Sequence, residues 1–211
     1  MNIRHEEERD YRYVEELTKR AFWNLHAPGC NEHYLAHCLR KHADFVPELD
    51  FVAELDGKIV GNIMYTKSKL VNEKNEEKTI LTFGPVSVEP AYQRRGIGRK
   101  LIEYSVAKAK ELGYEYIVIF GSPSNYVGLG FKSCKRYNIY VGDKIYPSAM
   151  LAMQLAGDGL GDQGWRYSES PAYELDDQEA EKFDETFEPM EKAVTNKQEE
   201  FFIMSRSQVR A

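Results

Sequence analysis

The spacing of apolar positions changes along the chain and predicts the first elements. Apolar residues three or four positions apart predict helices over residues 9–23 and 98–112. Asn31 is a suitable N-cap for a further helix that reaches about Lys41. The continuous apolar run over 116–120 is typical of a strand that is buried on both faces.

Strand patterns occupy much of the chain between these helices. Residues 51–55 and 58–68 predict two strands that Asp56-Gly57 joins as a hairpin. A strand over 79–88 contains Gly84-Pro85, and because proline cannot donate to the ladder, we expect a bulge or a local splaying there. Other predicted segments are short strands over 2–4, 131–134, 138–141 and 149–155, and a polar turn over 72–78. The order of elements indicates a mixed α/β sheet rather than an all-parallel one.

The last part of the chain differs in charge from the rest. Residues 176–211 contain ten acidic and five basic residues, which accounts for −5 of the net charge of −6. This shift predicts a main domain over 1–175 and an acidic C-terminal helical extension over 176–211. One stripe of an amphipathic helix, interrupted or restarted at Pro189, is predicted by Phe183, Phe187, Met190 and Val194. The apolar run 201–204 favours docking on the main domain over a free tail.

Composition excludes several classes of protein. Apolar residues make up 42% of the chain and charged residues 29%, which is ordinary globular usage. No run approaches the roughly 18 apolar residues of a membrane-spanning helix, and residues 1–10 lack the apolar core of a signal peptide. The net charge, 28 − 34 = −6, favours no nucleic-acid partner. The three cysteines are too few for a disulfide framework and favour the cytoplasm: Cys30, Cys38 and Cys134.

The segment 86–100 carries the most informative chemistry. It predicts a strand, a short loop and a helix start, where unpaired amides and the helix dipole favour an anion. Gly96 and Gly98 lack the side chains that would block a phosphate, and four cations surround them, namely Arg94, Arg95, Arg99 and Lys100. The alternative is a tight turn with a solvated basic face. The dinucleotide fingerprint and the P-loop both fit poorly.

Two motifs in this order resemble those of one known family. The run Gln93–Gly98 matches the Q/R-x-x-G-x-G/A signature of the GNAT superfamily of acetyl-CoA-dependent N-acetyltransferases. The segment from Tyr126 to Gly130-Phe131 is similar to the family's Tyr-x-x-x-Gly-Phe. The resemblance covers about residues 2–156. The strand near 150–155 and the Gly-rich turn before Tyr167 further resemble a bacterial subgroup of uncharacterised N-acetyltransferases.

The resemblance implies a fold and an activity. The fold is the GNAT acyl-CoA N-acyltransferase fold, an α/β (α+β) architecture with a mixed sheet. Its elements run strand, helix, helix, three strands, helix, strand, helix and two strands, here followed by the C-terminal extension. The activity is transfer of the acetyl group of acetyl-CoA to a primary amine by direct attack in a ternary complex. The co-substrate is acetyl-CoA and no metal is implied.

The resemblance also implies site residues. The diphosphate would bind the amides of Arg95 to Arg99, and the pantetheine arm would pair with the main chain of Val86 and Val88. The Val88 amide would act as an oxyanion donor. Tyr126 would support the departing thiolate, although its alternative is an aromatic packed on the sheet. A free tyrosine is about 1.5 pKa units weaker than a thiol, so late proton delivery is favoured. The residues implied to bind acetyl-CoA are Val86, Val88, Gln93, Arg94, Arg95, Gly96, Ile97, Gly98 and Arg99.

The proton acceptor stays open at this point. Glu54 and Glu89 are candidates, and solvated surface charge is the alternative for each. The cluster of Cys30, His33, His37, Cys38 and His42 has the residue types of a zinc site, but its spacing matches no strong pattern. Within the helical region that lines the acceptor site in this superfamily, candidates for substrate recognition are His37, His42, Asp44 and Asp50; polar surface groups of an amphipathic helix are the alternative.

The acceptor is equally open. It could be a small-molecule amine or a protein amine, and neither a nucleic acid nor a membrane is expected as a partner. Whether the chain forms a homodimer is left undecided. A rival function is a non-catalytic acyl-CoA-binding sensor or interaction module. A weaker rival is a general phosphate-binding or nucleotide-binding α/β protein.

Overall fold

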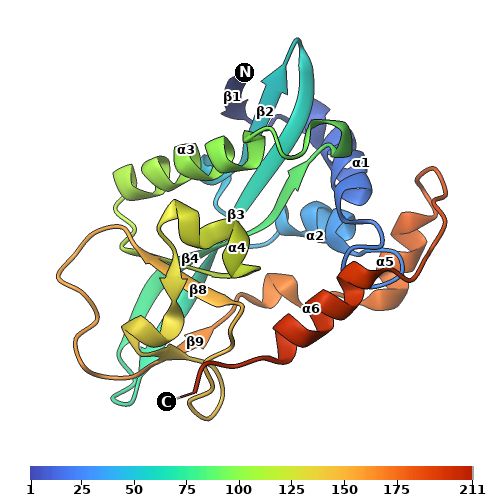
Figure 1. Ribbon diagram of the computed structural model, residues 1–211. Helices are drawn as coiled ribbons and strands as arrows, with labels where there is room; N and C mark the ends of the chain where they lie inside the picture. The colour runs from blue at the N-terminus through green and yellow to red at the C-terminus, as the bar shows by residue number, and fades with distance from the viewer. Residues whose placement is uncertain (211) are drawn as a thin grey trace.

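The elements follow the predicted order over most of the chain, as Figure 1 shows for the computed structural model, which describes residues 1–210. The helices are α1 Tyr11–Phe22, α2 Glu32–Leu39, α3 Ile97–Glu111, α4 Pro123–Tyr126, α5 Asp177–Asp184 and α6 Asn196–Arg206. The strands are β1 Asn2–His5, β2 Phe51–Leu55, β3 Lys58–Asn72, β4 Glu77–Val88, β5 Tyr116–Phe120, β6 Lys132–Ser133, β7 Ile139–Tyr140, β8 Met150–Gln154 and β9 Trp165–Ser168.

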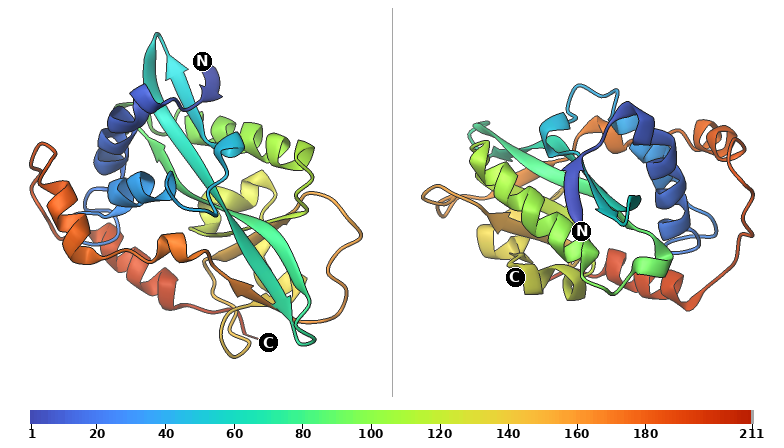
Figure 2. Two further views of the ribbon diagram at one scale, coloured as in Figure 1. Left: turned by 180° about the vertical axis from the view of Figure 1, so that it is seen from behind. Right: turned by 90° about the horizontal axis from the view of Figure 1, so that it is seen from above.

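Within residues 1–210, nine strands form one sheet in the order β1-β2-β3-β4-β5-β8-β6, with β9 pairing with β3 and β7. The β4 and β5 strands are parallel, and their neighbours on this path are antiparallel. The mixed α/β class predicted from the sequence is therefore confirmed. Helix α3 covers one face of the sheet, and α1 and α2 cover the other (Figure 2). Leu101 of α3 and Leu17 of α1 are fully buried against these two faces.

Two predictions about strand extent are wrong. The strand predicted to end at Ser68 continues to Asn72, and its partner begins at Glu77, so the polar turn is shorter than 72–78. The Asn72 side chain makes this tight turn, because its Oδ1 accepts hydrogen bonds from the amides of Lys74 and Glu76. Strand β9 was not predicted at all, and it pairs with the distal end of β3.

The irregularity expected at Gly84-Pro85 is confirmed. Ile63 of β3 pairs with Val86 and Tyr65 pairs with Phe83, so Gly84 and Pro85 together oppose a single residue. Two residues opposite one define a β-bulge. Before the bulge, β4 pairs with β5 at Leu81 and Ile117, and no later pair joins these strands within residues 1–210. The two strands therefore diverge toward their carboxyl ends.

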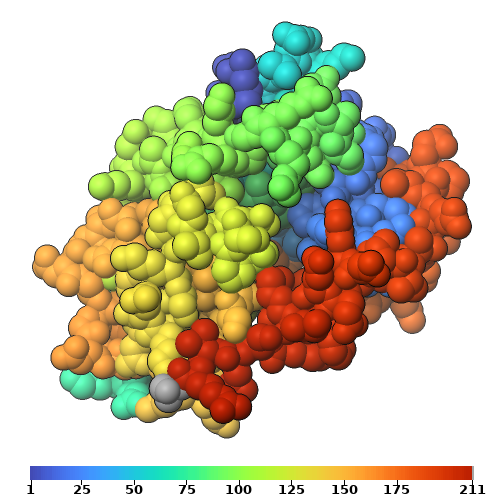
Figure 3. Space-filling model, in the orientation of Figure 1, coloured from blue at the N-terminus to red at the C-terminus, as the bar shows by residue number. Residues whose placement is uncertain are grey.

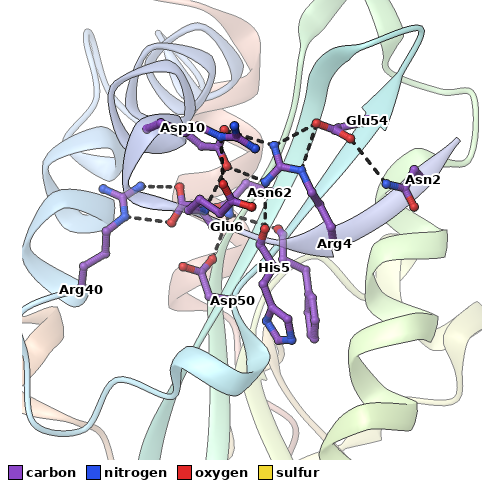
Figure 4. A network of polar contacts seen from close by, with 12 residues as sticks. Asn2, Arg4, His5, Glu6, Asp10, Arg40, Asp50, Glu54 and Asn62 are labelled. Atoms are coloured by element: carbon purple, nitrogen blue, oxygen red, sulfur yellow. Dashed lines mark hydrogen bonds and ion pairs between the residues drawn. The ribbon is translucent and has the colours of Figure 1, made fainter.

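A buried polar network joins α1 and β3 to the residues that follow β1, follow α2 and precede β2 (Figure 4). The Arg40 guanidinium donates to both carboxylate oxygens of Glu6, at 2.9 and 2.7 Å, and to Glu15 at 2.8 Å. Asp50 accepts a 3.2 Å hydrogen bond from Asn62. Burial, contact with the Glu6 carboxylate and its charge raise the pKa of Asp50 well above its ordinary value, against the opposing effects of Arg40 and Asn62.

This raised pKa predicts a pH-dependent effect of Asp50→Asn. The folded chain holds the Asp50 proton more tightly than the unfolded chain, so this group contributes stability below pH 4 that is lost as pH rises through its folded pKa. We expect the substitution to raise the free energy of unfolding by about 1 kcal/mol at pH 8 and by much less at pH 4. Urea unfolding at the two pH values measures it. Asp56→Asn, in an exposed turn, is the matched control, and an equal effect at both pH values would contradict the prediction.

The first part of the C-terminal extension packs on α1 and α2. Lys19, only 2% exposed, contacts the Asp184 carboxylate at 2.7 Å, and His33 Nε2 lies 3.1 Å from the same oxygen. The Phe183 ring packs on His33, and Phe187 is buried beside it. The predicted docking of this part is therefore observed.

The single helical stripe predicted across Pro189 is wrong. Helix α5 ends at Asp184, and Val194 is 86% exposed. Hydrogen bonds to the segment after α1 hold this irregular stretch instead, because Asn24 Nδ2 donates to the Glu191 carbonyl and Asn24 Oδ1 accepts from the Ala193 amide.

Helix α6 then crosses the molecule to a distant loop. The Phe201 ring, halfway along the helix, stacks on His26 with 4.3 Å between the ring centroids. Beyond its end, the Ser148 amide donates to the Ser207 carbonyl and the Val209 amide donates to the Tyr146 carbonyl. Figure 1 shows α6 (red) running between these two anchors below α4. The segment 185–209 is thus held by contacts with α1 and the residues after it up to Phe201, and by the loop 146–148 at its end.

Candidate functional site

The turn between β4 and α3 has the backbone needed to expose amides. Arg94 has φ 62° and Gly96 has φ 81°, so two residues of this loop lie in the left-handed region. Gly96 precedes the first helical residue, and a Cβ on it would meet nothing within 4 Å. Glycine is therefore favoured there by backbone conformation rather than by space. Gly98 differs, because a Cβ on it would point toward Val88 at 3.5 Å from Cγ2.

Positive charge surrounds this turn. Arg94, Arg95, Arg99 and Lys100 are all exposed, and the first turn of α3 has no acidic residue. Arg99 pairs with Glu103 at 2.8 Å, one turn further along the helix. The helix dipole and these cations have the same sign, so the turn favours a phosphate or diphosphate group.

Beyond the bulge, β4 no longer pairs with β5 along one of its edges. The Glu89 amide donates to the Val60 carbonyl of β3 at 3.0 Å, whereas the Val88 carbonyl accepts from Gln93 Nε2 at 3.1 Å. Main-chain groups alternate in direction along a strand. Val86 and Val88 therefore direct their main-chain groups away from β3. The resemblance described above implies that the pantetheine arm binds on this side of β4. The Val88 carbonyl already has a partner in Gln93, so of its two main-chain groups only the amide fits the predicted oxyanion role.

Tyr126 lies at the end of α4, on the other side of the diverging strands. Its ring packs closely on Gly121, because a Cβ on Gly121 would lie 2.4 Å from a carbon of the Tyr126 ring. The ring centroid is 6.0 Å from that of Phe83 and 5.8 Å from that of Phe131. Burial raises the pKa of Tyr126, so its hydroxyl is protonated at neutral pH and can donate. The packing alternative for this tyrosine is thus observed, and its role toward the departing thiolate stays a prediction.

The two glutamates considered as proton acceptors are engaged elsewhere. Glu54 accepts hydrogen bonds from Arg4 at 3.0 and 2.8 Å, and this contact lowers its pKa. Glu89 forms a bidentate pair with Arg20. The lowered pKa makes Glu54 a poor base, and the Glu89 carboxylate is occupied by the Arg20 guanidinium. Neither side chain supports the role that the sequence left open.

The cysteine and histidine cluster divides into separate contacts. His33 lies between Cys30, at 3.6 Å, and Asp184. His37 instead contacts Glu15 at 3.0 Å. Burial raises the pKa of the Cys30 thiol to about 12 and lowers that of His33 to about 4. Cys30 is therefore a neutral thiol rather than a thiolate ligand or nucleophile.

Of the four residues considered for acceptor recognition, Asp44 contacts β3 through its carbonyl, which accepts from the Lys67 amide at 2.8 Å. Its Oδ2 accepts a 2.7 Å hydrogen bond from Ser170, and His42 lies 3.7 Å from the same oxygen. Asp50 is buried in the network of Figure 4, and His37 contacts Glu15. The interpretation of Asp50 as an acceptor-binding residue is therefore wrong, because its carboxylate is enclosed by α1, α2 and β1.

A segment that the sequence pattern did not predict reaches the bulge from the α1–α2 face. The Tyr167 hydroxyl lies 2.7 Å from Thr82 Oγ1, and the Tyr173 hydroxyl donates to the Gly84 carbonyl at 3.3 Å. The aromatic residues at alternate positions Trp165 and Tyr167 were the available signal for β9. The surface is hollowed where α4, the α1–α2 region and α6 meet (Figure 3).

Comparison with known proteins identifies relatives of the chain. It is 29% identical over 102 residues to an uncharacterized N-acetyltransferase, YjhQ, from Escherichia coli strain K12; the match covers 48% of this chain and 52% of that protein. The chain thus spans about half the length of this curated relative.

Solved structures share the fold. One is a GNAT family N-acetyltransferase (YhbS) from Escherichia coli in complex with CoA, with a TM-score of 0.70 at 22% identity over 82% of this chain and 92% of that chain. Another is a GNAT family acetyltransferase from Brucella melitensis in complex with acetyl-CoA, with a TM-score of 0.64 at 25% identity over 82% of this chain and 97% of that chain. In the described part of the chain, no helix combines the length and apolarity needed to span a membrane.

The family model for the acetyltransferase (GNAT) family matches residues 18–131, which is more than half of the chain. These residues include the β4–α3 turn, the diverging strands and Tyr126. The predicted resemblance is confirmed, and the protein belongs to the GNAT family of acetyltransferases.

Proposed function

We propose that the protein transfers the acetyl group of acetyl-CoA to a primary amine, by direct attack within a ternary complex. The observation that carries this proposal is the shared location of three features. The β4–α3 turn favours a diphosphate, the free edge of β4 leads from it, and Tyr126 lies across the gap between β4 and β5. The complexes of two relatives with CoA and acetyl-CoA support the same donor.

The residues at the turn and the strand edge would bind and orient the donor. Main-chain amides from Arg95 to Arg99 and the nearby cations would hold the diphosphate. The open edge at Val86 and Val88 would pair with the amides of the pantetheine arm as an added strand does. The Val88 amide would donate to the oxygen that becomes negative during attack.

Tyr126 would donate a hydrogen bond to the departing sulfur. Its raised pKa makes early loss of the proton costly, since a free thiol is already about 1.5 pKa units more acidic than a free tyrosine. The proton would therefore transfer late, after the carbon–sulfur bond has lengthened.

The test combines a binding and a turnover measurement. Titration calorimetry with acetyl-CoA reports the donor, and mass spectrometry of a panel of small amines and peptides reports acetylated product. Acetylation of at least one amine supports the proposal. Tight binding of acetyl-CoA without any product would favour the non-catalytic sensor, and absence of binding would exclude both.

We also propose that the described part of the C-terminal extension, residues 176–210, braces α1 and α2 of the main domain, residues 1–175. The contact of Lys19 with Asp184 supports this role. Lys19→Met should lower the free energy of unfolding by about 2 kcal/mol, because it leaves a partly buried carboxylate without its cation. Urea unfolding measures the loss, with Lys182→Met on the exposed face of α5 as control. Equal stability of both variants would show that the extension is not held in this way.

A further inference from the structure

The face of the sheet opposite α3 carries a cluster of tyrosines around the β4 bulge. Tyr167 of β9 is 6% exposed, and its hydroxyl contacts Thr82 Oγ1, two residues before Gly84. Tyr173, in the turn Pro171–Tyr173, accepts a hydrogen bond from Thr66 and donates to the Gly84 carbonyl. The segment from β9 to this turn is therefore held against the bulge at two points.

Glu169 lies between these two anchors. It follows Tyr167 by two positions, and an extended chain directs such side chains to the same face. The next residue, Ser170, is buried and donates to Asp44 at 2.7 Å, which holds this part of the backbone in place. Glu169 itself is exposed, so an incoming molecule can reach its carboxylate.

The bulge connects the segment that carries Glu169 to the reacting groups expected on the other face of the sheet. Tyr126 packs on Phe83, and Tyr173 contacts Gly84, the next residue. Phe120, at the end of β5, is 46% exposed, with its ring centroid 5.8 Å from that of Tyr167. The two faces thus meet at the bulge, where β5 has separated from β4.

The charged neighbour that acts on Glu169 is another carboxylate, Glu174. Unlike Glu54 and Glu89, Glu169 forms no ion pair within residues 1–210. Desolvation and the charge of Glu174 raise the pKa of Glu169, and a hydrogen bond with Tyr167 partly opposes them. A carboxylate with a raised pKa and no cationic partner is suited to attract an ammonium group and to take a proton from it.

We propose that Glu169 binds the ammonium group of the acceptor and takes its proton, in a subsite whose walls are Phe120, Tyr167 and Tyr173. This proposal rests on the proposed acetyl transfer, and it defines the acceptor class as a cationic alkylamine next to an apolar or aromatic group. Aromatic faces favour both parts of such a molecule, because they bind apolar groups and attract cations.

The step balances without any further reactant. The acceptor ammonium gives one proton to Glu169, and the neutral amine nitrogen forms a bond to the thioester carbon. The carbon–sulfur bond then breaks with its electron pair on sulfur, which takes the proton of Tyr126. The second nitrogen proton passes to the Tyr126 oxygen, and the products are an amide and free CoA thiol. Glu169 returns its proton to solvent.

The expected pH dependence follows from the groups that face Glu169, which are Tyr167, Tyr173 and Glu174. The pKa of Tyr167 and that of Tyr173 are raised by burial, so both hydroxyls stay neutral across the working range. Activity should therefore fall on the acid side as Glu169 becomes protonated, and this fall should begin at a higher pH than an ordinary glutamate would give.

The experiment compares the effect of one variant on two acceptors, of which only one must lose a proton before attack. One is an aryl-substituted alkylamine, which is protonated at pH 7, and the other is an aromatic amine, which is already neutral. We expect Glu169→Gln to lower kcat/KM about 100-fold or more for the alkylamine and less than about 3-fold for the aromatic amine. Its acetyl-CoA affinity should stay within about 2-fold of the wild type.

Further variants make the result specific. Glu169→Asp should recover part of the alkylamine activity, and Glu200→Gln, an exposed glutamate on α6, should change neither reaction. The acid limb of the pH profile should move to higher pH in Glu169→Gln, because the amine itself must then be deprotonated in solution. Equal losses with both acceptors, or no loss, would overturn the role of Glu169 alone. A wild type that binds acetyl-CoA but acetylates no amine would instead refute the proposed function and this inference with it.

Discussion

Gly98→Leu should weaken acetyl-CoA binding at least about 100-fold while the chain stays folded. A Cβ at this position points toward Val88, so a leucine side chain would extend into the space between the α3 N-terminus and the β4 edge. A diphosphate held by two main-chain amides would lose both hydrogen bonds. Each such bond to a charged group contributes about 1.5–3 kcal/mol, and about 2.8 kcal/mol corresponds to a factor of 100.

Gly98→Ala separates this blocking effect from a general loss of structure. Its Cβ would meet Val88 at an ordinary contact distance of 3.5 Å, and Gly98 does not need a positive φ. Alanine should therefore bind acetyl-CoA within about 10-fold of the wild type. Titration calorimetry gives the affinities and thermal unfolding shows that both variants fold. A folded Gly98→Leu variant with wild-type affinity would place the diphosphate elsewhere.

Tyr126→Phe should lower kcat about 100-fold with little change in acetyl-CoA affinity. The substitution keeps the ring that packs on Gly121, Phe83 and Phe131 and removes only the hydroxyl. Loss of a proton donor to the leaving group typically costs a factor of 10² to 10⁴, and it acts in the transition state rather than in the bound complex.

The control for this variant is Tyr13→Phe, which removes a hydroxyl from a 39% exposed tyrosine on α1. Steady-state kinetics with a fixed amine should show wild-type kcat for the control. With Tyr126→Phe, an acceptor-independent measure such as the affinity for acetyl-CoA should stay unchanged. Wild-type kcat in Tyr126→Phe would leave this tyrosine with a packing role only.

The sequence identified the donor side of the site better than the acceptor side. Gly96 and Gly98 belong to a short turn whose backbone already indicated an anion site, and the family resemblance implied a donor role for Tyr126. The residues that face them from the α1–α2 side lie in β9 and the following turn. The Tyr167 contact with Thr82 joins residues 85 positions apart, and no local pattern predicts such a pairing.

The carboxylates also show how little of a side chain's chemistry can be predicted from sequence. Glu54, Glu89 and Asp50 are similar residue types. In the structure, Glu54 pairs with Arg4, Glu89 pairs with Arg20, and Asp50 is buried beside Glu6. Their chemistry depends on partners that the fold brings together. Glu169 became a candidate only because the structure leaves it accessible and without an arginine.

The sequence by itself determined the elements whose causes are local. The spacing of apolar residues and the types of residue in the turns specified the hairpin at Asp56-Gly57, the buried strand β5 and the glycine turn that precedes α3. Tertiary structure alone decided where β4 and β5 separate, which carboxylates find a cation, and that residues 165–173 return to the bulge. The physical reason is that a turn depends on the conformations open to a few neighbouring residues, whereas the pKa and partners of a side chain depend on every group that packing places around it.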